Sequence, residues 1–223
     1  MEMSKRQRIK AALAGKAVDR VPVGFWRHWP GDDQNAKSLA HVALEFQQRY
    51  DLDFIKIPVS STYCVSDYGV KHEYRGKLIG DRELLDHLVI GVEDWKRIEP
   101  LDVTKGNYRQ HLQALRLIIE KRESDIPIIF TIFNPLSMAS YLAGDETLLV
   151  HLRRYPEKVE KALKALSKTC SSFVKMVIAE GADGIFLSTR WASYELMNQD
   201  EYLRFGKPGD LAVLAASSVP CLF

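Results

Sequence analysis

The run IPIIFTIF at residues 126–133 is the feature that most limits how this chain can fold. It is almost wholly apolar and rich in β-branched residues, so it predicts a strand that is buried on both faces of its sheet. Helical patterns flank it on either side, at residues 108–122 and 135–143. A buried strand between two helices favours a parallel sheet built from βα units.

The same alternation continues along the chain. Apolar residues at helical spacing predict further helices over residues 4–14, 34–50, 145–154, 156–180 and 199–216. Strand patterns cover VPVGFW (21–26), DFIKIPVS (53–60) and DGIFLST (183–189), and SVPCLF (218–223) begins another. We therefore expect about five strands in a single domain over residues 1–223.

Residues 68–92 break this pattern and predict one or two β-hairpins inserted after the second strand. No G-x-G-x-x-G or P-loop motif follows a strand, so a nucleotide-binding doubly wound sheet is disfavoured. Polar or aromatic side chains follow the strands instead: Arg27 and His28, Ser60 and Tyr63, Asn134, and Arg190 with Trp191. Because (β/α)₈ barrels build their sites at the carboxyl ends of their strands, we predict an α/β fold of the TIM-barrel type, incomplete with five of eight strands.

Charge and composition exclude several classes of protein. The 31 basic and 29 acidic residues are interspersed and leave a net charge of +2, which disfavours a nucleic-acid or membrane-surface partner. The charged N-terminus does not resemble a signal peptide, and no apolar stretch is long enough to cross a membrane. Three cysteines far apart indicate a reducing compartment, so we expect a cytoplasmic protein. The six histidines show no metal-binding spacing, and no metal site is expected in this portion.

Several stretches of this sequence resemble the uroporphyrinogen decarboxylase superfamily, in the right order along the chain. RIKAALAGKAVDRVPVGFWR resembles the opening helix, the Asp-Arg-Val-Pro-Val turn and the first strand. RYDLDFIKIP, PIIFTIFNPLSMASYLAG and AEGADGIFLST resemble the next three strands, and EYLRFGKPGDLAVL resembles the following helix. The resemblance implies a (β/α)₈ barrel. It also implies a cofactor-free decarboxylase of tetrapyrrole acetate side chains or, in other branches, a methyltransferase that uses a corrinoid and zinc.

The resemblance transfers to this sequence only in part. It implies that Arg27 anchors a substrate carboxylate and that Tyr141 donates a hydrogen bond near the scission site. The second arginine of the motif falls on Gly31, and the acidic residue that holds the pyrrole N–H groups is replaced by Ser60. We therefore expect a divergent member that acts on a small carboxylate-bearing ligand, with decarboxylation as its nominal class.

Two other functions stay open. In the methyltransferase branch the zinc ligands would lie beyond residue 223, because family members are longer than this chain. The third interpretation is an inactive fragment that binds only a ligand or a partner chain. A homodimer, or pairing with a separate C-terminal piece, is expected from the same resemblance.

The proposed site residues also have plain structural interpretations. Arg27 can pair at the surface with Asp32 or Asp33, and His28 can be a structural histidine. Tyr141 can simply pack against the barrel. We predict Arg27 and Tyr141 as catalytic residues. The predicted substrate-binding residues are His28, Ser60, Tyr63, Asn134, Arg190 and Trp191.

Overall fold

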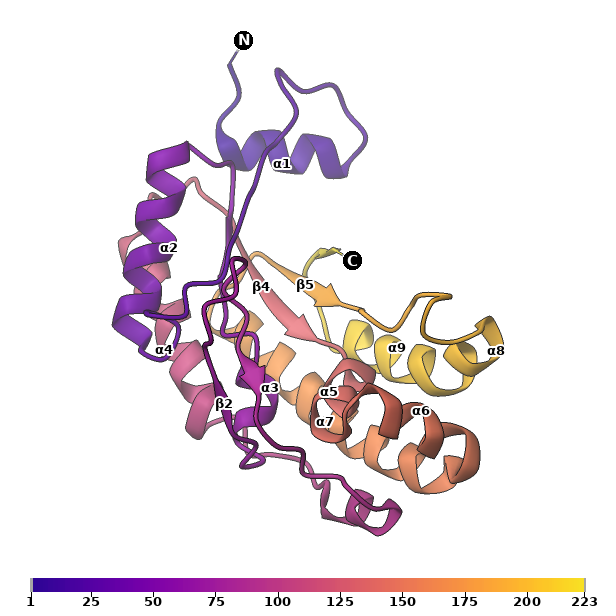
Figure 1. The fold of residues 1–223 in the computed structure, drawn as a ribbon. Helices are drawn as coiled ribbons and strands as arrows, with labels where there is room; N and C mark the ends of the chain where they lie inside the picture. Colours follow the sequence, from indigo (N-terminus) through magenta and orange to yellow (C-terminus); the bar gives the residue numbers. More distant parts are fainter. Residues whose placement is uncertain (1, 223) are drawn as a thin grey trace.

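A computed structural model describes residues 2–222 of this protein. Four parallel strands form its main sheet (Figure 1). The strand order is β1-β4-β5-β6. The strands span Ile55–Lys56 (β1), Ile128–Phe133 (β4), Gly184–Ser188 (β5) and Cys221–Leu222 (β6). Register pairs Lys56 with Ile129 and Ile129 with Gly184. The sheet over these residues is an open segment of a barrel wall, as predicted for an incomplete TIM-type fold; Phe223 of the last predicted strand lies outside the described residues.

The predicted first strand is wrong. Residues 21–26 are extended but join no ladder, and Val21, Phe25 and Trp26 are exposed. A single backbone bond, from the Asp53 amide to the Val23 carbonyl (2.8 Å), ties the segment to the start of β1. Pro22 cannot donate, and the Val23 amide donates to the Asp53 side chain at 2.7 Å rather than to a strand.

The predicted helices are present, apart from one interruption. The α-helices are α1 (Lys5–Leu13), α2 (Ala36–Tyr50), α3 (Tyr63–Ser66), α4 (Gly106–Lys121), α5 (Pro135–Ala143), α6 (Asp145–Arg154), α7 (Pro156–Ala179), α8 (Gln199–Glu201) and α9 (Lys207–Ala215). A turn of π-helix at Tyr202–Gly206 divides the helix predicted over 199–216 into α8 and α9. A proline opens both α5 and α7, where its missing N–H costs nothing.

The insertion after β1 contains one short hairpin. Strands β2 (His72–Glu73) and β3 (Glu83–Leu84) pair antiparallel, with His72 opposite Leu84. The predicted second hairpin strand, HLVIGV, is irregular and leads into a 3₁₀ helix at Val92–Arg97. The residues between β2 and β3 contact the segment that follows β1, where the Arg82 amide donates to Ser61 Oγ at 3.0 Å.

The hydrophobic core lies between the sheet and the helices that cover its outer face (Figure 1). Phe130 of β4 points to this side and packs edge-on against Phe173 of α7, with ring centroids 5.4 Å apart. Side chains alternate along a strand, so Ile129, Thr131 and Phe133 point to the opposite, inner face. The outer face therefore stabilises the fold, and the inner face is free to carry ligand sites.

Within residues 2–222, none of the helices has the length and apolar character that a membrane crossing would require.

Candidate functional site

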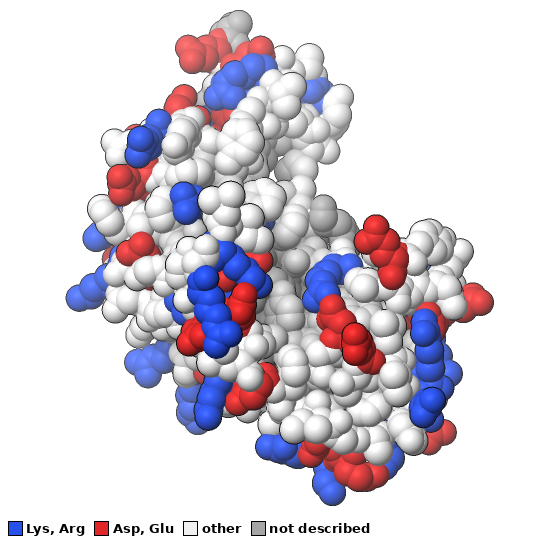
Figure 2. All heavy atoms as spheres, viewed as in Figure 1, with Lys and Arg blue, Asp and Glu red and all other residues white. Residues whose placement is uncertain are grey.

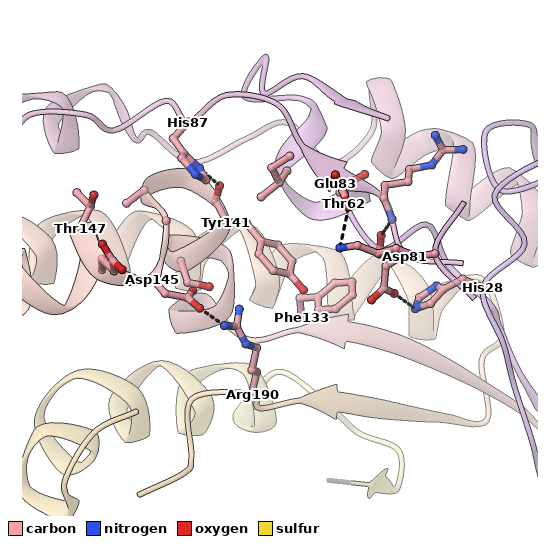
Figure 3. A pocket seen from close by; sticks show the side chains of 18 residues that line it. His28, Thr62, Asp81, Glu83, His87, Phe133, Tyr141, Asp145, Thr147 and Arg190 are labelled. Atoms are coloured by element: carbon pink, nitrogen blue, oxygen red, sulfur yellow. Dashed lines mark hydrogen bonds and ion pairs between the residues drawn. The ribbon is translucent and has the colours of Figure 1, made fainter. Parts of the chain in front are cut away.

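A cavity of about 820 Å³ opens at the carboxyl ends of β4 and β5. Phe133 at the end of β4, Tyr141 of α5 and Arg190 after β5 form one wall, and the loop between β2 and β3 forms the other (Figure 3). Figure 2 shows that basic and acidic side chains lie close together on both sides of a hollow on this face. The size suits a small-molecule ligand, and the position is the one that TIM-type barrels use for their sites.

Side-chain contacts of Arg82 and His28 fasten the loop wall to the rest of the protein. Arg82 donates to Asp33 Oδ1 at 2.7 Å and to the Pro30 carbonyl at 2.6 Å, and both side chains of this ion pair are largely buried. His28 contacts Asp81 Oδ1 through Nε2 at 3.1 Å and the Val59 carbonyl through Nδ1 at 3.1 Å.

Both ring nitrogens of His28 therefore face oxygen atoms. The imidazole ring joins the loop, through Asp81, to the residues that follow β1.

The opposite wall carries Tyr141 and Arg190. The Tyr141 hydroxyl points into the cavity (Figure 3), and burial raises the pKa of this phenol above its usual value, so it acts as a neutral donor at pH 7. Arg190 pairs with Asp145 in the first turn of α6, and its side chain is 42% exposed. An anionic ligand can reach this guanidinium by displacing a half-exposed carboxylate, because such pairs contribute little to stability.

Three of the predicted site residues, His28, Tyr141 and Arg190, thus line one cavity. Arg27, predicted as the carboxylate anchor, does not. It lies outside the cavity with its guanidinium over the Trp29 ring, 4.7 Å from the centroid, and it pairs with neither aspartate considered from the sequence. The reason is that residues 21–26 do not form the strand that would have aimed Arg27 at the cavity.

The structure does not bring the other four predicted residues to this cavity. The Tyr63 hydroxyl donates to the Thr131 carbonyl at 2.9 Å inside the core, and Trp191 is fully buried. Asn134 caps α5 and donates to Asp210 at 2.8 Å. Ser60 is buried, and its hydroxyl lies 3.4 Å from the Thr62 hydroxyl.

Sequence reasoning missed the charged residues of the β2–β3 loop and of the start of α6. They line the cavity and are Lys77, Asp81, Arg82, Glu83, Asp145 and Glu146. The loop residues belong to an insertion outside the βα pattern, so no strand end pointed to them. The one available signal was the density of charge in KHEYRGKLIGDRE.

A metal ion finds no binding site among residues 2–222, where no three His, Cys, Asp or Glu side chains converge. The described residues therefore do not fit the zinc that the methyltransferase branch implies.

Comparison with known proteins agrees with this architecture. The family description "Uroporphyrinogen decarboxylase (URO-D)" matches residues 4–216. The methylcobamide:CoM methyltransferase MtbA of Methanosarcina acetivorans is 24% identical over 220 residues, which cover 93% of this chain and 64% of that protein. MtaA of Methanosarcina barkeri, with the same activity in its name, is 24% identical over 92% of this chain and 64% of its own length.

A solved structure, described as a methyltransferase from Methanosarcina mazei, superposes with a TM-score of 0.84 at 22% sequence identity. The match covers 99% of this chain and 69% of that one. The present chain spans slightly less than two thirds of the length of the curated relatives that it matches. This chain shares the fold of that methyltransferase, and the extent of the family match shows that it belongs to the uroporphyrinogen decarboxylase family.

Proposed function

We propose that this chain takes part in methyl transfer from a methylated corrinoid to a small anionic thiol, and that its cavity binds the thiol. The observation that carries the proposal is that relatives matching more than nine tenths of this chain are named methylcobamide:CoM methyltransferases. This favours the methyltransferase alternative over the decarboxylase that the sequence put first.

The charges of the cavity suit such a ligand. Coenzyme M is a short thiol that carries a sulfonate, and a guanidinium binds a sulfonate well because two of its N–H groups can donate in parallel. Arg190 is the cation that can be released for this purpose, because its partner Asp145 is itself 40% exposed. The neutral Tyr141 hydroxyl lines the same cavity and supplies a further donor.

The remaining cations of the cavity have other tasks. Arg82 is committed to the buried Asp33, and Lys77 lies 3.4 Å from Glu83. His28 contacts Asp81 Oδ1 at 3.1 Å and fixes the loop. The thiolate is the form of the ligand that accepts a methyl group.

The decarboxylase has less support from the site itself. Ser60 replaces the acid expected at that position and lies in the interior, and Arg27 is turned away from the cavity. A cofactor-free decarboxylase needs an anion to balance charge on its protonated pyrrole, and a hydroxyl does not supply one.

Calorimetric titration with coenzyme M tests the proposal, with ethanethiol as the control ligand that lacks the sulfonate. We expect coenzyme M to bind and ethanethiol to bind far more weakly. Replacing Arg190 with Met should weaken coenzyme M binding by roughly 10–150-fold, the value of one charge-assisted hydrogen bond. Arg153→Met is the matched control, because Arg153 forms an exposed pair with Glu201 and does not line the cavity.

Equal binding by the two variants would reject the role of Arg190. Absence of coenzyme M binding by the unmodified protein would reject the proposal. Release of CO₂ from uroporphyrinogen would restore the decarboxylase, and inertness toward both compounds would favour the inactive binding fragment. Incubation with methylcob(III)alamin and coenzyme M, followed by mass spectrometry of the thiol, tests the methyl transfer directly.

A further inference from the structure

His87 lies between β3 and the 3₁₀ helix at Val92–Arg97, and its ring lines the same cavity as Tyr141 and Arg190 (Figure 3). Its Nδ1 lies 3.1 Å from the Tyr141 carbonyl oxygen. A carbonyl oxygen can only accept a hydrogen bond, so Nδ1 carries the hydrogen of this contact. In the neutral ring the lone pair then lies on Nε2, and this nitrogen is the one that can take up a proton.

The carboxyl end of α5 orients the His87 ring. The carbonyl groups in the last turn of a helix have no partner within the helix. His87 Nδ1 donates to the carbonyl of Tyr141, and the Val89 amide donates to the carbonyl of Leu142 at 2.9 Å. Both contacts lie at the negative end of the helix dipole, which stabilises the positive charge of a ring that has accepted a proton. The end of α5 therefore supports His87 in the role of a base.

The opposite ring nitrogen, Nε2, is open to the cavity. Residues 2–222 provide it with no hydrogen-bond or ion-pair partner. It lies beside Gly144, where a Cβ would come within 3.2 Å of Nε2. Because this position is a glycine, no side chain there covers the nitrogen. His87 is itself exposed, so a ligand in the cavity can reach Nε2.

The position of His87 suits a short thiol with an anionic group at its other end. Gly144, beside His87 Nε2, is followed directly in the chain by Asp145, the partner of Arg190. The guanidinium proposed to bind the sulfonate and the free nitrogen of His87 therefore contact consecutive residues. A ligand held at Arg190 can place its thiol beside His87 in the same cavity.

The other titratable groups of the cavity are poorer acceptors of a thiol proton. Tyr141 is a neutral donor, because burial raises the pKa of its phenol. His28, the other histidine of the cavity, has an oxygen atom beside each ring nitrogen. A carboxylate is a weaker base than an imidazole, and a charged lysine or arginine has no lone pair to offer. These acidic and basic residues are Lys77, Asp81, Arg82, Glu83, Asp145, Glu146 and Arg190.

On the basis of the methyl-transfer function above, we propose that His87 is the general base that accepts the proton of the bound thiol. The S–H bond breaks, its electron pair stays on sulfur, and the proton forms an N–H bond with the Nε2 lone pair. A thiolate and an imidazolium result, a pairing that activates cysteine nucleophiles in enzymes. When the sulfur takes the methyl group, the electron pair of the broken carbon–cobalt bond stays with the corrinoid, and the imidazolium returns its proton to solvent.

The ionisation of bound coenzyme M tests this role in the unmodified protein. Thiolate is measured by ultraviolet difference spectra, because it absorbs where the thiol does not. We expect the midpoint of thiolate formation to lie at least about one pH unit lower for bound than for free coenzyme M. Calorimetry in two buffers of different ionisation enthalpy counts the protons released on binding. At pH 7 we expect thiolate to form with almost no proton released to the buffer, because the protein keeps the proton.

His87→Asn separates the base from the structural contact. The asparagine amide can still donate to the Tyr141 carbonyl in place of Nδ1, but it has no basic nitrogen. We expect this variant to keep its Tm and to bind coenzyme M, while the midpoint of thiolate formation returns toward that of the free thiol. His41→Asn is the matched control, because His41 is exposed on α2 beside Glu45 and does not line the cavity.

The possible results separate this inference from the function on which it rests. Binding of coenzyme M with an unshifted midpoint would overturn the role of His87 and leave the proposed function intact. An equal shift in the His87→Asn and unmodified proteins would leave His87 as a cap of α5 only. Thiolate formation with one proton released to the buffer for each bound ligand would show that no group of the protein accepts the proton. Absence of coenzyme M binding by the unmodified protein would overturn both proposals.

Discussion

The carboxylate of Asp53 holds the N-terminal segment to the sheet, and its neutralisation is the most informative test of the fold. Asp53 is fully buried and accepts four hydrogen bonds. Arg8 donates at 2.6 Å, Arg20 at 2.5 and 2.9 Å, and the Val23 amide at 2.7 Å. Arg8 is itself 3% exposed and also binds Asp19, so two guanidinium groups and two carboxylates form one network.

Asp53→Asn removes the charge but keeps the size of the side chain. Breaking a buried ion pair costs about 3–5 kcal/mol, because the remaining charges stay desolvated without a partner. For a protein of this length the loss corresponds to a decrease of roughly 6–20 °C in Tm. The matched control is Asp102→Asn, since Asp102 pairs with Lys105 at the surface and should contribute less than about 1 kcal/mol.

Urea unfolding followed by circular dichroism measures both variants. A loss below about 1 kcal/mol for Asp53→Asn, equal to that of the control, would refute the view that this network stabilises the fold. The pH dependence gives a second readout. Burial raises the pKa of Asp53, but the hydrogen bonds from Arg20, Val23 and Arg8 outweigh it, and the net pKa is lowered. The stabilisation is therefore present above the unfolded pKa of about 3.9 and is lost as pH falls below it, a loss that the Asn variant should not show.

Three further predictions concern the cavity loop and the interior. Gly80→Ala should raise the B-factors of the loop in a crystal structure and lower Tm, because φ is +85° there and a Cβ would lie 2.8 Å from the His28 carbonyl oxygen; an unchanged Tm would contradict this close approach. Arg82→Met should destabilise the protein by about 3–5 kcal/mol in urea unfolding, because it leaves Asp33 buried without its cation, and a near-neutral effect would show that the loop is not fastened in this way. Burial lowers the pKa of His111, so the free energy of unfolding should fall as pH drops below about 6.5, the unfolded value; a flat profile between pH 7 and 5, or an equal decrease in His111→Asn, would exclude this histidine as the cause.

Local sequence patterns were enough to predict most of the helices and the central strands. The apolar run at 126–133 and the stripe of residues 156–180 depend only on neighbours in the chain, and they lie where the patterns put them. The pattern of VPVGFW was misleading, because a strand also needs a partner ladder. The Val23 amide donates to the Asp53 side chain instead of to a neighbouring strand. Arg20, from the Asp-Arg pair before the run, donates to the same carboxylate.

The candidate site was likewise predictable from the sequence only in part. The sequence determined that polar groups follow the strands, and His28, Tyr141 and Arg190 were found because each stands close to a strand end or a resembling motif. Whether such a side chain reaches a ligand was decided only by tertiary structure. Tyr63 points into the aromatic core and Arg27 points to solvent, since a single residue's direction depends on how the backbone turns after the strand.

The tertiary structure alone brought the β2–β3 loop against the cavity and Lys56 against Trp26 and Phe186. The contact of Lys56 with Phe186 joins residues 130 positions apart. The energies of such contacts come from burial and from long-range ion pairs rather than from local propensity. The local pattern of apolar residues determines the order of strands and helices. The chemistry of the inner face depends on which side chains, distant in the sequence, are buried next to one another.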